Sequence, residues 1–226
     1  MNADSLNRPI WNALAGRQAA FATGGDKAKR FLPDVNMLAG IADDTPPALE
    51  ALADLVPQEG KLILLQAGES PPLPPSLVDH VDAGVQMVAE RAIAAPAAHP
   101  AIPLGDADAP EMLALATLTE PGPFLPRTHL LGGFWGIRED GRLAAMAGER
   151  LRLDGLTEVS GVCTHPDFRG RGYARLLSQL VASRIQARGE TPFLHAYAVN
   201  EAAIGLYRSL GFRLRAEMSV TVLMRE

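Results

Sequence analysis

The alternation of apolar and polar positions changes character near residue 100. Before it, apolar stretches are short and interrupted by glycine and proline; after it, they follow strand and helix periods closely. In the second part the pattern predicts a mixed α+β fold with the order β-α-α-β-β-β-α-β-α-β. The predicted elements are strand 102–104, helix 108–118, a short helix 128–131, strands 134–139, 142–153 and 157–164, helix 172–188, strand 191–199, helix 201–210 and strand 212–224.

Turn and capping residues support these boundaries. Asp140-Gly141 and Asp154-Gly155 are dipeptides typical of tight hairpin turns. Asp108 and Asn200 are predicted N-caps, because their side chains accept a bond from a free helix N–H. Gly211 is placed where a helix commonly ends.

The first part predicts helix 8–22, strand 35–41, helix 44–55, strand 61–66, an extended proline-rich connector 70–75 and strand 84–93. The prolines between 96 and 103 indicate a linker. We therefore expect an N-terminal α/β region over 1–94, a linker over 95–100 and a second domain over 101–226.

Charge and composition exclude several classes of protein. The net charge of −5 comes entirely from residues 1–100, and residues 101–226 are neutral, so a nucleic-acid partner is not expected. Cys163 is the lone cysteine, which favours a reducing compartment. Because the sequence has neither a secretory leader nor an apolar run of about 18 residues, no membrane association is expected and the predicted location is cytoplasmic.

The glycine turn between the predicted strand 157–164 and helix 172–188 carries the most chemistry. It reads Arg169-Gly170-Arg171-Gly172-Tyr173-Ala174. A helix N-terminus has unpaired N–H groups and a favourable dipole for anions, and glycine lets a ligand approach the backbone. The turn therefore predicts a phosphate or pyrophosphate site, with Arg169, Arg171 and Arg175 adding charged contacts.

A dinucleotide-binding fingerprint competes for this turn. It requires a third glycine where Arg175 stands, and it follows the first strand of its domain. Neither condition holds, so that interpretation is set aside.

A second block follows the turn after one strand: Asn200-Glu201-Ala202-Ala203-Ile204-Gly205-Leu206-Tyr207-Arg208-Ser209-Leu210-Gly211-Phe212. The two ordered blocks resemble the signatures of the GNAT acetyltransferase superfamily, and the resemblance covers residues 101–226. It implies a GNAT fold whose mixed central sheet splays after its fourth strand. Some relatives, such as glycine N-acyltransferase-like proteins, place a degenerate copy of this fold in front, and the α/β mixture of residues 1–94 is compatible with that arrangement.

The resemblance implies acetyl-CoA as co-substrate and no metal. The strand before the turn would pair its backbone with the pantetheine arm, and Gly161 is compatible with a bulge that frees N–H groups for the thioester oxygen. Tyr207 occupies the family's general-acid position, although packing in the core is its alternative role. The residues expected to contact acetyl-CoA are Val162, Cys163, Thr164, Arg169, Gly170, Arg171, Gly172, Tyr173, Ala174, Asn200 and Tyr207.

The acceptor amine needs a base, and Glu158 is the predicted one because it alternates with Ser160 along the strand that leads to the site. Glu149 and His195 are rivals, and a chain of waters is a further alternative. Cys163 is rejected as a nucleophile, since a free cysteine is commonly a small buried apolar residue and strand alternation points it away.

The predicted function is therefore acetyl transfer from acetyl-CoA to a primary amine of a small molecule or peptide, by direct attack in a ternary complex. One alternative is a non-catalytic module that binds acyl-CoA and regulates a partner; another is transfer of a longer acyl chain. The sequence does not identify the acceptor, and a homodimer is compatible with it.

Overall fold

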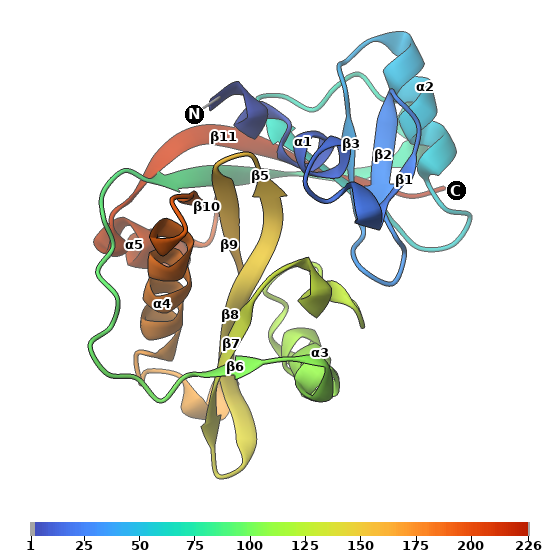
Figure 1. Cartoon of the computed structure of the whole chain (residues 1–226). Coiled ribbons are helices and arrows are strands. Elements are labelled where there is room, and N and C mark those ends of the chain that lie inside the picture. Colours follow the sequence, from blue (N-terminus) through green and yellow to red (C-terminus); the bar gives the residue numbers. More distant parts are fainter. Residues whose placement is uncertain (1–2, 226) are drawn as a thin grey trace.

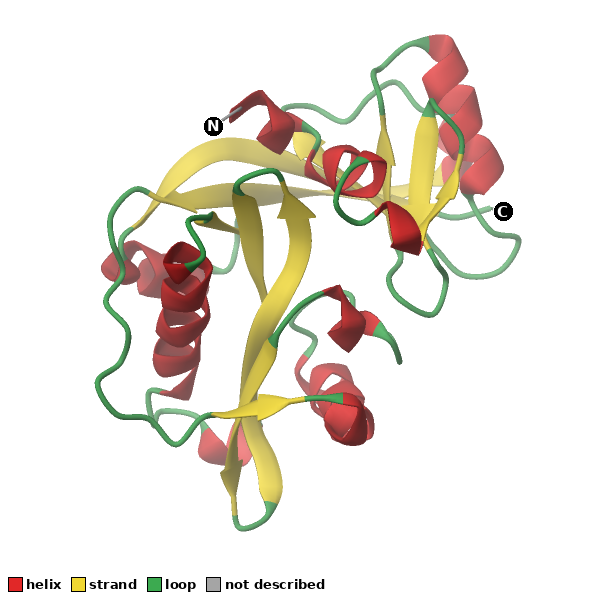
Figure 2. Cartoon of the chain, viewed as in Figure 1, coloured by secondary structure: helices red, strands yellow, loops and turns green. Residues whose placement is uncertain are grey.

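The computed structural model describes residues 3–225, and its strands form one sheet (Figures 1 and 2). The strand order is β1-β2-β3-β4-β11-β5-β10-β9-β8-β7-β6. The strands are Ala22–Gly24 (β1), Ala28–Phe31 (β2), Leu38–Ile41 (β3), Leu62–Ala67 (β4), Val78–Ala89 (β5), Ile102–Leu104 (β6), Phe134–Glu139 (β7), Arg142–Leu153 (β8), Leu156–Thr164 (β9), Thr191–Tyr197 (β10) and Phe212–Leu223 (β11). The α-helices are Pro9–Ala15 (α1), Pro46–Leu55 (α2), Ala109–Thr119 (α3), Tyr173–Ala187 (α4) and Glu201–Leu210 (α5).

The predicted order of residues 101–226 is confirmed, and local chemistry explains its boundaries. The β7–β8 hairpin turns at Asp140 and Gly141, whose φ angles of 50° and 78° suit a tight turn. Asn200 caps α5, because its side chain accepts a bond of 3.1 Å from the Ala203 N–H. Asp108 occupies the predicted N-cap position of α3, but its side chain makes no cap bond: the carboxylate instead accepts bonds from the Gly105 N–H and Arg138.

The first part differs more from its prediction. The helix predicted over 8–22 ends at Ala15, and Gln18 is buried, with its amide bonded to the Arg150 carbonyl and the Arg152 N–H. Strands β1 and β2 have no counterpart in the predicted elements. They are only 3 and 4 residues long, too short to show an alternation of apolar and polar residues, and pairing with neighbouring strands stabilises them. Strand β5 begins at Val78 instead of residue 84, since it pairs along most of β11.

The two parts of the chain follow the same strand pattern. Strands β1, β2 and β3 are antiparallel, and α2 leads from β3 to a parallel strand, β4. Likewise β7, β8 and β9 are antiparallel, and α4 leads from β9 to parallel β10. The last strand of each part is exchanged: β5 pairs with β10 and β11, while β11 pairs with β4 and β5.

This exchange joins strands from both sides of the predicted boundary at residues 94–101 in one sheet. Strand β5 belongs by sequence to the first part, yet it lies between two strands of the second. A buried cluster also joins the parts, with Ile10, Leu14 and Phe31 in the same core as Leu151 and Phe193. The predicted linker, residues 95–100, lies between the end of β5 at Ala89 and the start of β6 at Ile102.

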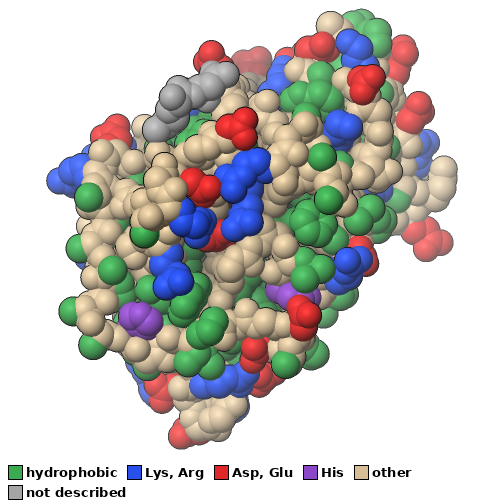
Figure 3. All heavy atoms as spheres, in the orientation of Figure 1, with side chains coloured by type: hydrophobic (Ala, Val, Ile, Leu, Met, Phe, Trp, Pro, Cys, Tyr) green, Lys and Arg blue, Asp and Glu red, His purple; other side chains and the backbone are tan. Residues whose placement is uncertain are grey.

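Helices α4 and α5 lie together on one face of the second part of the sheet (Figure 1). Their apolar sides pack with β5, β8 and β10 in a buried cluster that includes Leu177, Val181 and Phe212. On the face seen in Figure 3, acidic and basic side chains are interspersed. No helix of residues 3–225 is long and apolar enough to cross a bilayer.

Candidate active site

The glycine turn follows β9 and opens α4, as predicted. Gly170 and Gly172 have φ angles of 79° and 80°, a conformation that side chains rarely adopt, and Gly172 is the N-cap of α4. Among residues 3–225, no atom apart from those of the glycine and its adjacent residues lies within 4 Å of where a Cβ would stand on either glycine. The turn therefore borders an open cavity of about 450 Å³, here called the turn cavity.

The turn's charged side chains have partners at its rim. The Arg171 guanidinium lies 3.6 Å from Glu139 and over the Phe168 ring, with 5.1 Å between guanidinium carbon and ring centroid. The Tyr173 hydroxyl donates to Glu139, which raises the pKa of Tyr173. Arg175 donates to Ser209 Oγ at 2.6 Å.

The predicted bulge lies at Gly161. Met146 pairs with Cys163 and Gly148 with Ser160, so Ala147 faces two residues, Gly161 and Val162. Gly161 has a φ of 63°, which favours glycine. Beyond this point β9 also leaves β10, with which it pairs only over 156–158. The splayed strand opens the space that a ligand arm needs between β9 and β10.

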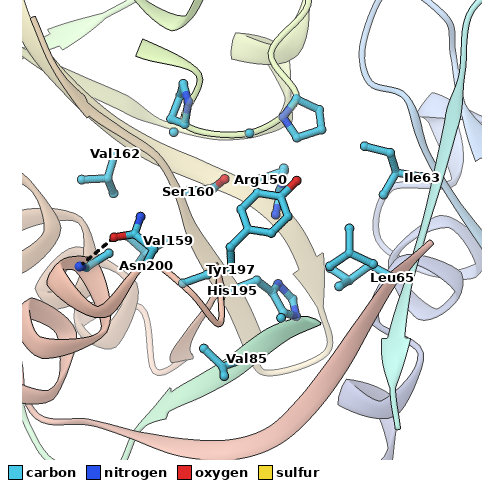
Figure 4. A pocket seen from close by; sticks show the side chains of 18 of the residues that line it. Ile63, Leu65, Val85, Arg150, Val159, Ser160, Val162, His195, Tyr197 and Asn200 are labelled. Atoms are coloured by element: carbon cyan, nitrogen blue, oxygen red, sulfur yellow. Dashed lines mark hydrogen bonds between the residues drawn. The ribbon is translucent and has the colours of Figure 1, made fainter. Parts of the chain in front are cut away.

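A second cavity of about 170 Å³, the seam cavity, lies in this splay (Figure 4). Arg150, Ser160 and His195 line one side, and Ile63 and Leu65 of the first part line the other. The two cavities share the lining residues Glu120, Pro121, Val162 and Asn200. They therefore meet at the bulge, where one ligand from each would come together.

A buried ion pair joins Arg150, which lines the seam cavity, to Glu158 behind it. Arg150 donates from Nε to Glu158 Oε2 at 2.8 Å and from Nη2 to Oε1 at 2.7 Å. A second bulge, where Arg150 and Leu151 both face Glu158, directs Arg150 toward this carboxylate. The Leu151 N–H also donates to Glu158 Oε2 at 3.2 Å.

This environment does not suit the base role predicted for Glu158. Burial alone would raise its pKa, but Arg150 and His195 overcome that effect and lower it from 4.5 to about 2. The side chain is fully buried, and its two oxygens accept hydrogen bonds from Arg150, the Leu151 N–H and His195. A carboxylate held in this way has little tendency to take a proton, and its hydrogen bonds fix the positions of Arg150 and His195.

The two rival bases are also engaged. Glu149 is buried and pairs with Arg152 and Arg188, each at 2.9 Å. The His195 Nδ1 lies 2.7 Å from Glu158, and its Nε2 lies 2.9 Å from the Gln86 amide nitrogen.

The tautomer of His195 follows from its neighbours. Gln86 accepts from Arg215 through Oε1, and its amide nitrogen also donates to the Leu6 carbonyl. That orientation makes the amide nitrogen a donor to His195 Nε2, so the ring is neutral and its Nδ1–H donates to Glu158. Neither ring nitrogen is left for a substrate.

Tyr207 lines the seam cavity from α5 and is buried. Within residues 3–225 its hydroxyl has no hydrogen-bond partner. Burial, with a contribution from Glu158, raises the pKa of Tyr207 to about 12, so the hydroxyl keeps its proton. Its ring packs against Phe212, with centroids 6.0 Å apart. The predicted packing role and a free proton donor thus coexist in one side chain.

Cys163 is buried among apolar side chains, and burial raises the pKa of its thiol to about 11. A thiol of that kind is a poor nucleophile. Its neighbour Thr164 lines the turn cavity, and its buried Oγ1 has no hydrogen-bond partner among the residues that the structure describes. Asn200 lines both cavities while its side chain caps α5.

Sequence reasoning missed four parts of the site. Arg150 is hidden by a bulge that local sequence does not reveal, and Gln86 belongs to the part of the chain predicted as a separate region. Ile63 and Leu65 read only as an apolar strand. Glu120 had a usable signal, since it stands directly before Pro121-Gly122-Pro123 at the end of a helix.

The chain is similar to known proteins in fold and, to different degrees, in sequence. The family model of FR47-like proteins matches residues 134–221. A crystal structure described as an acetyltransferase from the GNAT family, from Novosphingobium aromaticivorans, is 42% identical, covers 98% of each chain and superposes with a TM-score of 0.91. A GCN5-related N-acetyltransferase from Kribbella flavida shares the fold at 19% identity, with 100% and 96% coverage and a TM-score of 0.61.

A curated relative matches a shorter segment. The [ribosomal protein bS18]-alanine N-acetyltransferase of Salmonella typhimurium is 40% identical over 77 residues, which are 34% of this chain. The match spans about half, 51%, of that protein's length.

Proposed function

The chain belongs to the GNAT family of acetyltransferases, and we propose that it transfers the acetyl group of acetyl-CoA to a primary amine of a small molecule or peptide. The observation that carries this proposal is the meeting of two cavities at the Gly161 bulge. One is bordered by an anion-binding turn and the other by a mixed polar and apolar chamber.

The residues of the turn cavity fit coenzyme A. Two left-handed glycines leave the backbone at the start of α4 open, which suits a pyrophosphate. Arg169 and Arg171 supply positive charge at the rim, and the orphaned Thr164 Oγ1 offers a hydrogen bond to the ligand. The Asn200 side chain is occupied as a cap, so we assign any ligand contact there to its backbone.

The chain's own contribution to chemistry is orientation and charge stabilisation. A bulge takes backbone groups off the strand ladder, so we place the donor for the thioester oxygen at Gly161–Val162. Tyr207 would give a proton or hydrogen bond to the departing sulfur. A pKa of about 12 is above that of an ordinary thiol, but a thiolate leaving into a cavity is also destabilised and binds a proton more readily.

Thiol release and calorimetry test the function. Acetyl-CoA should bind in isothermal titration, and a panel of primary amines should include one that releases free coenzyme A. Binding without release for any amine would favour the alternative, a regulatory acyl-CoA-binding module. Absence of binding at millimolar acetyl-CoA would refute both.

The variant Tyr207→Phe tests the acid. Turnover should fall by about 10²-fold or more while acetyl-CoA affinity stays within twofold. Tyr197→Phe is the matched control, because Tyr197 also lines the seam cavity but is 41% exposed at its mouth. Equal turnover of Tyr207→Phe and wild type would remove Tyr207 from the mechanism.

We also propose that residues 1–94 are a degenerate copy of the same fold. The support is the repeated order of three antiparallel strands, a crossover helix and a parallel strand, with the last strands exchanged. Superposing β2–β4 with α2 on β8–β10 with α4 tests this; a crossover of opposite hand would contradict it.

A further inference from the structure

One carboxylate stands where the two cavities meet. Glu120 lines both of them, and no other Asp or Glu of residues 3–225 lines either. The other titratable or charged residues of the seam cavity are Arg150, His195, Tyr197 and Tyr207, and those of the turn cavity are Cys163, Arg169, Arg171, Tyr173 and Arg175.

Glu120 differs from the other acidic residues near the site in having no partner. Within the described part of the chain its carboxylate forms no ion pair or hydrogen bond, and the residue is exposed. Glu158 and Glu149 are each neutralised by arginine. Glu120 is thus the uncompensated negative charge on the walls of the seam cavity.

The backbone fixes Glu120 at this point. It ends α3 in a left-handed conformation, with φ 48° and ψ 54°, and its N–H donates to the Ala116 carbonyl at 2.8 Å. Pro121 follows, and the loop then passes over Arg150, whose Nη1 lies 3.9 Å from the Cβ position of Gly122. The helix end and the proline loop therefore fix the backbone of Glu120 at the junction.

We propose that Glu120 binds the ammonium group of the acceptor and accepts its proton before the amine attacks. This inference rests on the proposed function and names the base that the reaction needs. An alkyl amine has a pKa of about 10 and arrives charged at neutral pH, so it must lose a proton before it can form a bond to carbon.

The proton balance is complete without a further reagent. One proton passes from the ammonium to Glu120, whose exposure lets it pass the proton on to water. The amine nitrogen then bonds to the thioester carbon, and the carbon–sulfur bond breaks. The sulfur takes up one proton as it leaves and the nitrogen releases its second proton, so these two proton transfers cancel. The products are an amide, coenzyme A as the thiol, and one proton in solution.

The variant Glu120→Gln tests the role with acetyl-CoA and the best primary amine of the panel. At pH 7, kcat/KM should fall by about 10²–10³-fold, with acetyl-CoA affinity within twofold of wild type. The deficit should shrink by about tenfold for each pH unit toward the amine's pKa, because the free amine then no longer needs a base. Glu120→Asp should recover part of the activity, and Glu50→Gln, on the exposed face of α2, should match wild type.

Hydroxylamine separates a base from a structural residue. It is already uncharged at neutral pH, so Glu120→Gln should acetylate it within about threefold of wild type. An equal loss with both nucleophiles at every pH, or no loss with either, would overturn the role of Glu120. Failure of the wild type to release thiol with any nucleophile would instead refute the proposed function itself.

Discussion

Arg150, which lines the seam cavity, binds both carboxylate oxygens of Glu158, at 2.8 and 2.7 Å. Glu158 is the predicted catalytic base, and this pair holds its carboxylate in a fixed position. Its carboxylate also orients His195, which in turn is bonded to Gln86 from the first part of the chain. The contacts of this buried charge pair thus connect four strands, β8, β9, β10 and β5.

Removing one partner of this pair should lower the free energy of unfolding. Arg150→Met leaves the Glu158 charge buried without its cation, which costs about 3–5 kcal/mol in the free energy of unfolding. Urea denaturation followed by circular dichroism measures it. Lys27→Met, at an exposed pair whose atoms are 3.9 Å apart, should change the stability by less than about 0.5 kcal/mol. Similar losses in both variants would contradict the assignment.

The same pair predicts a dependence on acid. The folded-state pKa of Glu158 is about 2, below the ordinary value of 4.5, so its stabilisation is present above pH 4.5 and is lost as the pH falls toward 2. The shift corresponds to about 3 kcal/mol. Unfolding free energies between pH 7 and 3 should therefore fall less steeply in Glu158→Gln than in wild type. Parallel profiles would show that Glu158 does not carry this effect.

Two glycine-to-alanine changes should act in opposite directions. Gly172→Ala puts a side chain at φ 80°, which costs about 1–2 kcal/mol, and its Cβ would enter the turn cavity and weaken acetyl-CoA binding. Gly205→Ala lies inside α5 with open space around its Cβ, and should add about 0.5–1 kcal/mol. Thermal unfolding and calorimetry measure the two effects. Equal stability of the two variants would argue against the left-handed turn.

Cys163 should resist alkylation. With its thiol buried and its pKa raised to about 11, little thiolate exists at pH 8. Mass spectrometry after treatment with iodoacetamide should find the folded protein unlabelled and the urea-unfolded protein fully labelled. Cys163→Ala should retain acetyl transfer. Rapid labelling of the folded protein together with loss of turnover would restore the cysteine as a candidate nucleophile.

Residues 101–226 should not fold alone. Without β5, strands β10 and β11 each lose one of their two neighbouring strands. We expect no cooperative urea transition for 101–226, and partial recovery for 78–226, which restores β5. A cooperative transition with full acetyl-CoA binding by 101–226 would show that the predicted boundary is a functional one after all.

Much of the second half of the fold was predictable because its signals are local. The hairpin at Asp140-Gly141, the cap at Asn200 and the glycine turn each depend on a few adjacent residues. The bulge at Gly161 was also predictable, since a glycine inside an apolar strand often marks a bulge or a close approach of another backbone.

The remainder depends on contacts between distant residues. The Arg150–Glu158 pair needs a second bulge, and the neutral tautomer of His195 needs Gln86 and Arg215. The apolar wall of the seam cavity comes from Ile63 and Leu65, whose sequence signals only a strand. A pattern within one segment cannot reveal which other segment will face it.

The exchange of β5 and β11 also has a consequence for synthesis on the ribosome. About a hundred residues separate the end of β5 from the start of β10, which is about 5–20 s of translation. During that interval both edges of β5 are unpaired, because β10 and β11 have not been synthesised, and an unpaired strand edge can pair with other chains. Its first residues include the exposed Asp79, His80 and Asp82. The carboxylates of Asp79 and Asp82 disfavour pairing of this strand with other chains before its partners are made.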